Sequence, residues 1–341
     1  MSQVTSSSTS VSRSFLQAVT EAMHEEMARD ERVFLIGEDV GPYGGEMGQT
    51  QGLWQTYGEW RVRDAPVAEE AIVGCALGAA VTGCRPIAEI PFSDFIVNAM
   101  DMIVNQAAKM RYMFGGGIDV PLVVRTVTGG YLQAGAQHSQ SLEAWFTHVP
   151  GLKVVYPSTP ADAKGLLKAS IRTNDPVIFF EHKKLYGRRG PVPAGDVVVP
   201  LGVADVKRRG EHVSVIATGM LVHMALEAAD RLGDEDIQVE VIDLRTLVPL
   251  DIDTVIDSVT KTGRVVVAME APLRGSYAND IASTVTEACW DRLQAAPRRV
   301  GARDAPVPLH PDLEAFVLPG VTSVIEAVRA VMADGRAPGG G

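Results

Sequence analysis

Residues 65–95 read APVAEEAIVGCALGAAVTGCRPIAEIPFSDF, and this stretch decides the fold class. Its central run, rich in alanine and glycine, predicts a buried helix over about residues 70–82. Residues 87–90 (IAEI), apolar except for Glu89, predict a buried strand, and the acidic Asp94 follows soon after its end. A helix that leads into a largely apolar strand is typical of a parallel sheet covered by helices.

The same alternation continues on both sides of this stretch. Short apolar runs predict further strands at residues 33–36, 122–124, 153–156 and 177–180. Helical patterns separate these strands: one follows a capping box at Ser14 and Gln17, one covers residues 99–110, and one starts near Thr159. We therefore expect an α/β fold with a mostly parallel sheet.

A second, smaller α/β domain is expected after a break in this pattern. Residues 188–201 are rich in Gly, Pro and Arg and predict a linker. Beyond the linker, strands are expected near residues 213–217, 239–242 and 264–268. The predicted organisation is a disordered tail at 1–11, a first domain at 12–187, the linker, a second domain at 202–333 and a frayed tail at 334–341.

Composition excludes several classes of protein. The 341 residues include 31 Lys and Arg against 42 Asp and Glu, a net charge of −11 that gives no general reason to bind nucleic acid or an anionic membrane. The apolar run at residues 71–83 is too short to span a bilayer. Three cysteines without a CxxC pair argue against a disulfide framework and a zinc site. The N-terminal residues lack the apolar core of a signal peptide, so we expect a cytoplasmic protein.

Candidate catalytic residues cluster where strands are expected to end. The sequence contains no GxxxxGK[ST] loop, no HExxH and no GxSxG elbow. Ligands of open α/β sheets bind outside the carboxyl ends of the strands. The polar residues near these ends are Glu38, Asp39, Glu69, Glu70, Asp94, His138 and Glu181. Any single one is more often a helix cap or a solvated charge, so the pattern alone indicates an α/β enzyme and no particular reaction.

Seven segments, in this order, carry a family resemblance. They are VFLIGEDVGPYGG (33–45), the stretch at 65–95, KMRYMFGGG (109–117), QHSQSLEAWFTHVPGLKVVYPSTPADAKGLL (137–167), NDPVIFFEHKKLY (174–186), VEVIDLRTLVPLD (239–251) and EAPLRGSYANDIASTV (270–285). Through them the chain resembles the β subunit of the thiamine-diphosphate-dependent first component of 2-oxo acid dehydrogenase complexes, in the transketolase-like superfamily. The resemblance implies a pyrimidine-binding α/β domain followed by a smaller transketolase C-terminal domain.

The resemblance also implies roles for individual residues. Glu69 matches the glutamate that activates thiamine diphosphate by bonding its aminopyrimidine ring, while Val67 and Phe95 match residues of the same cofactor pocket. Core packing is the alternative role for Phe95. His138 matches a histidine that serves acyl transfer to lipoamide. Glu70 departs from the family, where an uncharged residue is usual, and we expect it to be an acid of the first helical turn.

A structural potassium ion is a further implication. In some relatives this ion is bound at the positions of Leu122, Ser170, Thr173 and Asp175. Thr173 replaces the more usual Asp, which weakens the expectation of a potassium site here.

Two motifs of thiamine enzymes are absent from the sequence. The chain has neither Gly-Asp-Gly nor Asn-Asn, which hold the diphosphate through Mg²⁺ in the superfamily. The resemblance therefore implies an α subunit that holds the diphosphate and Mg²⁺, in a heterotetramer of two α and two β chains, and an acyltransferase that carries lipoyl-lysine. The expected enzyme is pyruvate dehydrogenase, with acetoin dehydrogenase next and branched-chain (3-methyl-2-oxobutanoate) dehydrogenase third. A non-catalytic assembly subunit is the other class, and the joint presence of Glu69, Phe95 and His138 argues against it.

Overall fold

The first domain is built on a seven-stranded sheet. The computed structural model describes residues 10–334. The strand order is β12-β6-β7-β5-β4-β2-β3, and all neighbours are parallel except β12 and β6. The strands are β2 (Val33–Gly37), β3 (Val62–Asp64), β4 (Arg85–Ile90), β5 (Val123–Thr128), β6 (Lys153–Val155), β7 (Val177–His182) and β12 (Thr246–Val248). The predicted parallel α/β fold is confirmed.

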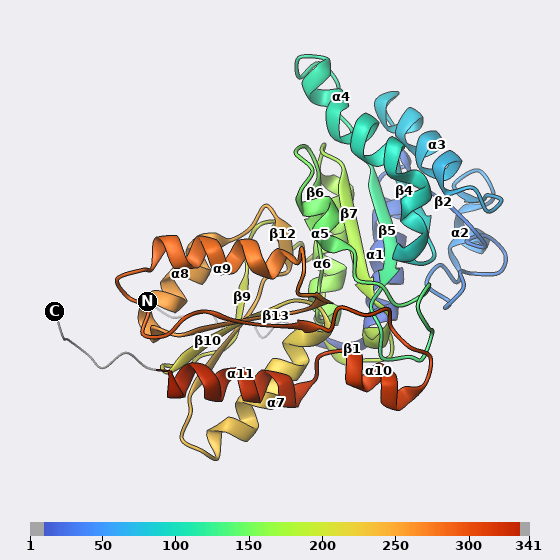
Figure 1. The fold of residues 1–341 in the computed structure, drawn as a ribbon. Coiled ribbons are helices and arrows are strands. Elements are labelled where there is room, and N and C mark those ends of the chain that lie inside the picture. Colours follow the sequence, from blue (N-terminus) through green and yellow to red (C-terminus); the bar gives the residue numbers. More distant parts are fainter. Residues whose placement is uncertain (1–9, 335–341) are drawn as a thin grey trace, which may run out of the picture.

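Helices cover both faces of this sheet (Figure 1). On one face, α1 (Phe15–Arg29) packs against α6 (Pro160–Arg172). The other face is covered by α3 (Glu69–Val81), the 3₁₀ helix η1 (Ser93–Ala99), the π-helical η2 (Asp101–Ala107), α4 (Ala108–Met113) and α5 (Glu143–Thr147). The single helix expected at residues 99–110 is thus three short helical pieces. The capping box of Ser14 and Gln17 at the start of α1 is confirmed.

The second domain repeats the α/β arrangement on a five-stranded sheet. Its order is β14-β13-β10-β11-β9, with only β9 antiparallel to its neighbour. The strands are β9 (Asp205–Arg208), β10 (Val213–Ala217), β11 (Val239–Asp243), β13 (Val265–Pro272) and β14 (Arg298–Ala302). Helices α7 (Met220–Gly233) and α11 (Val321–Ala333) cover one face, and α8 (Ile252–Thr262) and α9 (Tyr277–Ala288) cover the other.

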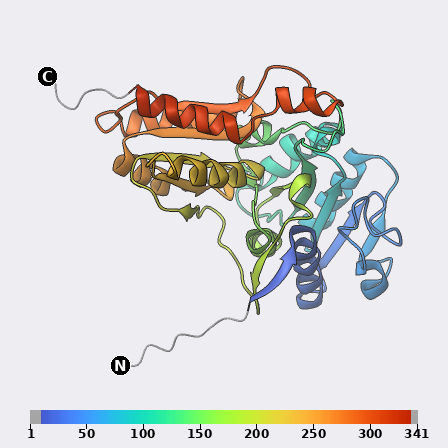
Figure 2. The same ribbon diagram turned by 90° about the horizontal axis from the view of Figure 1, so that it is seen from below.

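The two domains share one apolar core. Figure 2 shows them side by side. A single cluster of buried side chains runs from Ile72 of α3 through Phe146 and Leu247 to Ile216 of the second sheet. In addition, β12 follows the second-domain strand β11 in the chain and pairs with β6 of the first sheet. This continuity fixes the orientation of the second domain against the first.

Parts of the predicted tail and linker are ordered strands. β1 (Ser10–Ser14) pairs antiparallel with β8 (Arg189–Pro193), so residues 10 and 11 of the predicted disordered tail are ordered, and the predicted linker at 188–201 contains a strand. Their backbone groups satisfy one another, which composition alone does not indicate. Residues 1–9 and 335–341 lie outside the described part of the chain, and Asp334 caps α11 and pairs with Arg298.

One stretch has the length and hydropathy of a membrane span. It is Pro311–Ala333, with a mean hydropathy of 1.6. In the structure it is divided into α10 (Pro311–Val317) and α11, which starts at Val321. Val324, Val328 and Val331 of α11 are fully buried against the second sheet. The apolar residues are therefore those of a core helix of this domain.

Candidate active site

Four neighbouring strands end at the same edge of the first sheet. Strands β2, β4, β5 and β7 are mutually parallel. Glu38 directly follows β2, Phe92 and Asp94 follow β4, and Lys183 follows β7. Because ligands bind outside the carboxyl ends of such strands, this edge is the candidate active site.

Glu69 is the first residue of α3 and borders this edge. Its side chain is buried, and its Oε2 accepts a hydrogen bond of 3.1 Å from Nδ2 of Asn98 on η1. The residue before the helix, Ala68, offers no side-chain cap, so the free N–H groups of the first turn favour negative charge there. The helix start therefore places free backbone N–H groups beside the side chain of Glu69.

Glu69 remains reachable from outside the chain. An open surface hollow is lined by Glu69, Glu70, Asn98 and Met102. Glu70 is an exposed acid of the first turn of α3, as expected from the sequence. Val67, two residues before Glu69, is 79% exposed. A large apolar side chain that is this exposed beside a buried acid is available to a ligand or a partner chain.

Glu38 is a second acid near Glu69. Its Oε1 is buried and has no hydrogen-bond partner among residues 10–334. Burial raises the pKa of Glu38, and the negative charge of Glu69 raises it further. A buried carboxyl oxygen without a partner is costly in a folded protein, by about 1–3 kcal/mol. It is therefore available for a donor that the isolated chain does not supply.

Phe95 and His138 lie together at the same edge. Phe95 is on η1, as is Asn98, and its ring is half-buried. The imidazole of His138 meets the Phe95 ring edge-on at a centroid distance of 5.4 Å and the Phe92 ring edge-on at 4.8 Å. Through η1 the fold thus brings Glu69, Phe95 and His138 to one region, while Val67 stays at its outer margin.

Charged groups from two strand ends hold the loop that carries His138. Lys183 Nζ donates a hydrogen bond to the backbone carbonyl of His138. Asp94 Oδ1 accepts hydrogen bonds from the backbone N and from Nε2 of Gln140, at 3.2 and 2.9 Å. Asp94 Oδ2 is buried without a partner. The loop is therefore anchored immediately on both sides of Ser139.

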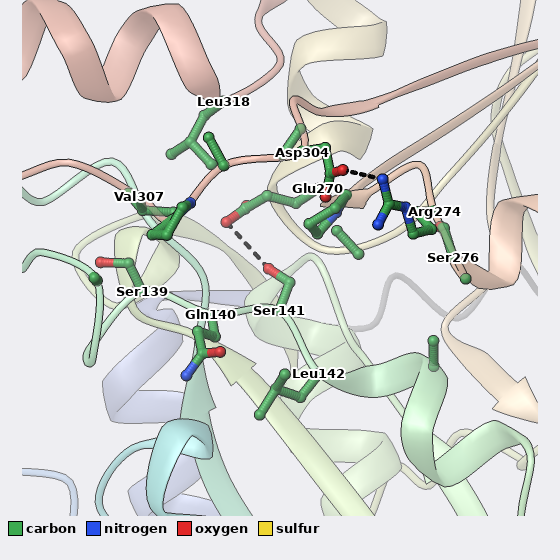
Figure 3. A pocket seen from close by; sticks show the side chains of 18 of the residues that line it. Ser139, Gln140, Ser141, Leu142, Glu270, Arg274, Ser276, Asp304, Val307 and Leu318 are labelled. Atoms are coloured by element: carbon green, nitrogen blue, oxygen red, sulfur yellow. Dashed lines mark hydrogen bonds and ion pairs between the residues drawn. The ribbon is translucent and has the colours of Figure 1, made fainter.

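The second domain holds the start and the end of the same loop. Glu270 of β13 accepts hydrogen bonds from the backbone N of Gly130 at 2.6 Å and from Ser141 Oγ at 3.3 Å. Its other oxygen lies 2.6 Å from Nε2 of His182. Ser141 and Glu270 both line an interdomain cavity of about 360 Å³. Figure 3 shows their side chains pointing toward each other along the hydrogen bond that joins them. Gln140 lines this cavity as well, so the loop separates the cavity from the site.

The side chains at this edge are better suited to bind an aminopyrimidine ring than a diphosphate with its metal ion. Glu69 and Glu38 offer carboxyl oxygens to ring and amino nitrogens, and Phe95 offers an aromatic surface. Within residues 10–334, no group of three or more His, Cys, Asp or Glu side chains could hold a metal ion. The sequence also lacks the two diphosphate motifs. The chain thus provides residues suited to one half of the expected cofactor.

The expected potassium site has donors that are already engaged. Ser170 Oγ donates to the carbonyl of Leu166, and the carbonyl of Leu122 accepts from Val177 N. The carbonyl of Thr173 accepts from Arg85. The carboxylate of Asp175 pairs with Arg111 and Lys153. These positions do not form a ready cation site, and potassium stays a prediction.

Two residues of the site were missed at the sequence level. Lys183 directly follows the observed strand β7 and could have been found by its position two residues after the candidate Glu181. Asn98 gives no such signal because it lies within the helical segment η1. Glu181 had been a candidate, but both of its oxygens bind the fully buried Arg125, at 2.6 and 2.9 Å. Glu181 is therefore a structural residue of the sheet.

Comparisons with known proteins agree with this architecture. A family model for the transketolase pyrimidine-binding domain matches residues 12–189, and a model for the transketolase C-terminal domain matches residues 202–324. A solved structure described as a split-gene transketolase, an inactive β4 tetramer, matches with a TM-score of 0.76 over 95% of this chain and 99% of that one. At 23% identity this likeness concerns the fold alone.

Several relatives are similar over almost their whole length. The chain is 47% identical to the acetoin:2,6-dichlorophenolindophenol oxidoreductase subunit beta of Cupriavidus necator, over 94% of this chain and 97% of that protein. Identity to the 2-oxoisovalerate dehydrogenase subunit beta of Bacillus subtilis is 47% (93% and 97% covered). Identity to the pyruvate dehydrogenase E1 component subunit beta of Bacillus subtilis is 44% (93% and 98% covered). The chain therefore belongs to the family of E1 β subunits of 2-oxo acid dehydrogenases, a thiamine-diphosphate-associated family built from the two transketolase-type domains.

Proposed function

We propose that this chain is the β subunit of pyruvate dehydrogenase (acetyl-transferring), which decarboxylates pyruvate and passes the acetyl group to lipoyl-lysine of an acyltransferase. The observation that carries a catalytic role is the buried carboxyl of Glu69 at the start of α3, next to Asn98 and within electrostatic range of Glu38. Together with Phe95 and His138, these groups exceed what a purely structural subunit needs.

The residues of the chain divide the proton chemistry between them. Thiamine diphosphate, when bound, supplies the carbon nucleophile that attacks the oxo group of the substrate. Glu69 would share a proton with the aminopyrimidine ring, and Asn98 fixes the orientation of the carboxyl through the bond to Oε2. Burial and the charge of Glu69 raise the pKa of Glu38, which lies close to this pair. Phe95 would offer its ring to the pyrimidine, and His138 would deliver a proton in the later transfer to lipoamide.

An α subunit completes the site in this proposal. The absence of Gly-Asp-Gly and Asn-Asn from the sequence assigns the diphosphate and Mg²⁺ to another chain. The exposed Val67 and the open hollow beside Glu69 support a contact of that chain at the site. We infer a heterotetramer of two α and two β chains, in which the β chain alone is inactive.

Acetoin and 3-methyl-2-oxobutanoate are the alternative substrates. Relatives named for acetoin, 2-oxoisovalerate and pyruvate have 47%, 47% and 44% identity to this chain, so similarity does not separate the three. The test is to co-express the chain with its α-type partner and to measure thiamine-diphosphate-dependent cleavage of each substrate with an artificial electron acceptor. The highest kcat/KM for pyruvate supports the proposal. A preference for acetoin or 3-methyl-2-oxobutanoate transfers the assignment to that enzyme, and no turnover of any of the three rejects it.

A further inference from the structure

Lys183 is a buried cation that the proposed proton chemistry does not use. Its side chain is only 4% exposed, although lysine is almost never buried without a partner. It directly follows β7, while the next residue, Lys184, is exposed. Burial lowers the pKa of Lys183, and the charges of Asp94, Glu270 and Glu314 oppose this effect. Three acids from two domains thus lie within electrostatic range of the ammonium group.

The ammonium group contacts the loop of His138 directly. Nζ of Lys183 donates a hydrogen bond to the backbone carbonyl of His138. The same Nζ lies over the face of the Phe92 ring, 5.7 Å from its centroid. Phe92 in turn meets the His138 imidazole edge-on at 4.8 Å. Lys183 therefore acts on His138 in two ways, through the main chain and through a shared aromatic neighbour.

The other hydrogen bonds that hold the loop of His138 bind residues on either side of His138 and not His138 itself. Gln140 is held by Asp94, and Gly130 and Ser141 are held by Glu270. All three of these anchors lie outside residue 138. Within the described chain, the bond from Lys183 is the one hydrogen bond from outside the loop to the main chain of His138 itself. The ring orientation of His138 thus depends on a charge that lies outside the loop.

We propose that Lys183 is a positioning residue that fixes the His138 imidazole for acyl transfer to lipoamide. The proposal rests on the proposed function of His138. A displacement of about 1 Å in a reacting group can lower a rate about a hundredfold. Loss of the ammonium group should therefore affect the transfer step, which needs the imidazole in place, and not decarboxylation, which depends on Glu69.

The test compares Lys183→Met with the matched control Lys184→Met in the assembled complex. Methionine preserves the length and burial of the side chain and removes its charge and hydrogen bonds. For Lys183→Met we expect acetyl transfer to a lipoyl domain to fall about ten- to hundredfold, while decarboxylation with an artificial acceptor stays within about threefold of wild type. Lys184→Met should change neither rate, and Lys183→Arg should restore part of the transfer rate because it retains a charged donor.

A second measurement is independent of activity. Amide hydrogen exchange of the peptide that covers residues 133–142 should become faster in Lys183→Met and stay unchanged in Lys184→Met. If the complex cleaves no 2-oxo acid, the proposed function fails, and this exchange still tests the anchoring role. Equal losses in transfer and decarboxylation, or an unchanged exchange rate, overturn the proposal. If Lys183→Met does not assemble, Phe92→Leu removes the shared ring and should give the same selective loss of transfer.

Discussion

The carboxyl edges of the two parallel sheets look alike in sequence and differ in structure. At the edge of the first sheet, Glu38 and Asp94 each keep a buried oxygen without a partner. At the edge of the second sheet, Asp243 accepts a hydrogen bond from Ser158, and Glu270 binds the first domain through both of its oxygens. Both edges therefore contain buried acids within or after apolar strands. Of these four acids, only Glu38 and Asp94 have a carboxyl oxygen without a hydrogen-bond partner among the described residues.

This difference separates a site from a domain contact. An unpartnered buried polar group destabilises the folded chain by about 1–3 kcal/mol, so it persists where another requirement retains it. In the proposed function, that requirement at the first edge is cofactor binding and proton transfer. At the second edge the acids attach the loop of His138 and the neighbouring helix to the second domain. The position of an acid at a strand end thus does not by itself indicate a functional site. Its hydrogen-bond partners must also be known.

The largest effect is expected for Glu69→Gln. The amide preserves the shape and loses the ionisable group, so decarboxylation should fall by about 10²- to 10⁴-fold. Assembly with the α subunit, measured by gel filtration, should be unchanged. Activity within threefold of wild type would remove Glu69 from the mechanism and would end the functional distinction between the two edges.

His138→Ala should separate the two steps of the reaction. Acyl-lipoamide formation should fall by about 10²-fold or more, because the proton donor of that step is lost. Decarboxylation with an artificial electron acceptor should fall much less. Both assays on one preparation control for folding, since a folding defect lowers them equally. Equal losses with normal assembly would show that His138 is not specific to transfer.

Glu143 tests the comparison of the two edges, because it is an unpartnered buried acid of the described chain that follows neither set of strand ends. It is fully buried in α5, neither oxygen has a partner, and burial raises its pKa to about 7. At a pH below 4.5, the ordinary pKa of this carboxyl, Glu143 is neutral in both the folded and the unfolded state. Its ionisation then does not lower the stability of the folded chain. As the pH rises to 7, the carboxyl ionises more easily in the unfolded state than in the folded one. A pKa shift of this size lowers the free energy of unfolding by about 3 kcal/mol.

The matched variant Glu143→Gln should not show this loss. The thermal midpoint of the variant, relative to that of wild type, should therefore rise between pH 5 and pH 8. The size of the rise should match the free energy of unfolding that wild type loses over this range. Decarboxylation should stay within about threefold of wild type, because no hydrogen bond in the described chain joins the Glu143 side chain to Glu69, Asn98 or His138. A large loss of decarboxylation would mean that unpartnered acids of the functional site extend beyond the first edge.

Glu270→Ala should affect stability more than chemistry. It leaves the Gly130 N–H and the His182 ring nitrogen buried without an acceptor, which should destabilise the folded chain by about 2 kcal/mol or more. The thermal midpoint should drop, while decarboxylation by the assembled enzyme should fall less than tenfold. A loss comparable to that of Glu69→Gln would place the second edge in the mechanism.

Local patterns were enough to predict the α/β fold and the edge that carries the site. The capping box at Ser14 and the strand ends near Glu38 and Asp94 follow from rules of a few residues. The pairing of β1 with β8 could not be predicted, since it joins segments far apart in the chain. Nor could the roles of Asn98 and Glu270, because tertiary contacts decide which polar groups meet. Glu69 and His138 came from the family resemblance, and their catalytic roles remain predictions.

The central claim is that this chain supplies the pyrimidine half of a shared site and a partner supplies the diphosphate half. Calorimetric titration of thiamine diphosphate with Mg²⁺ into the isolated chain and into the complex with the α subunit tests it most directly. We expect weak binding, independent of Mg²⁺, by the isolated chain and tight, Mg²⁺-dependent binding by the complex. Tight, Mg²⁺-dependent binding by the isolated chain would contradict the claim.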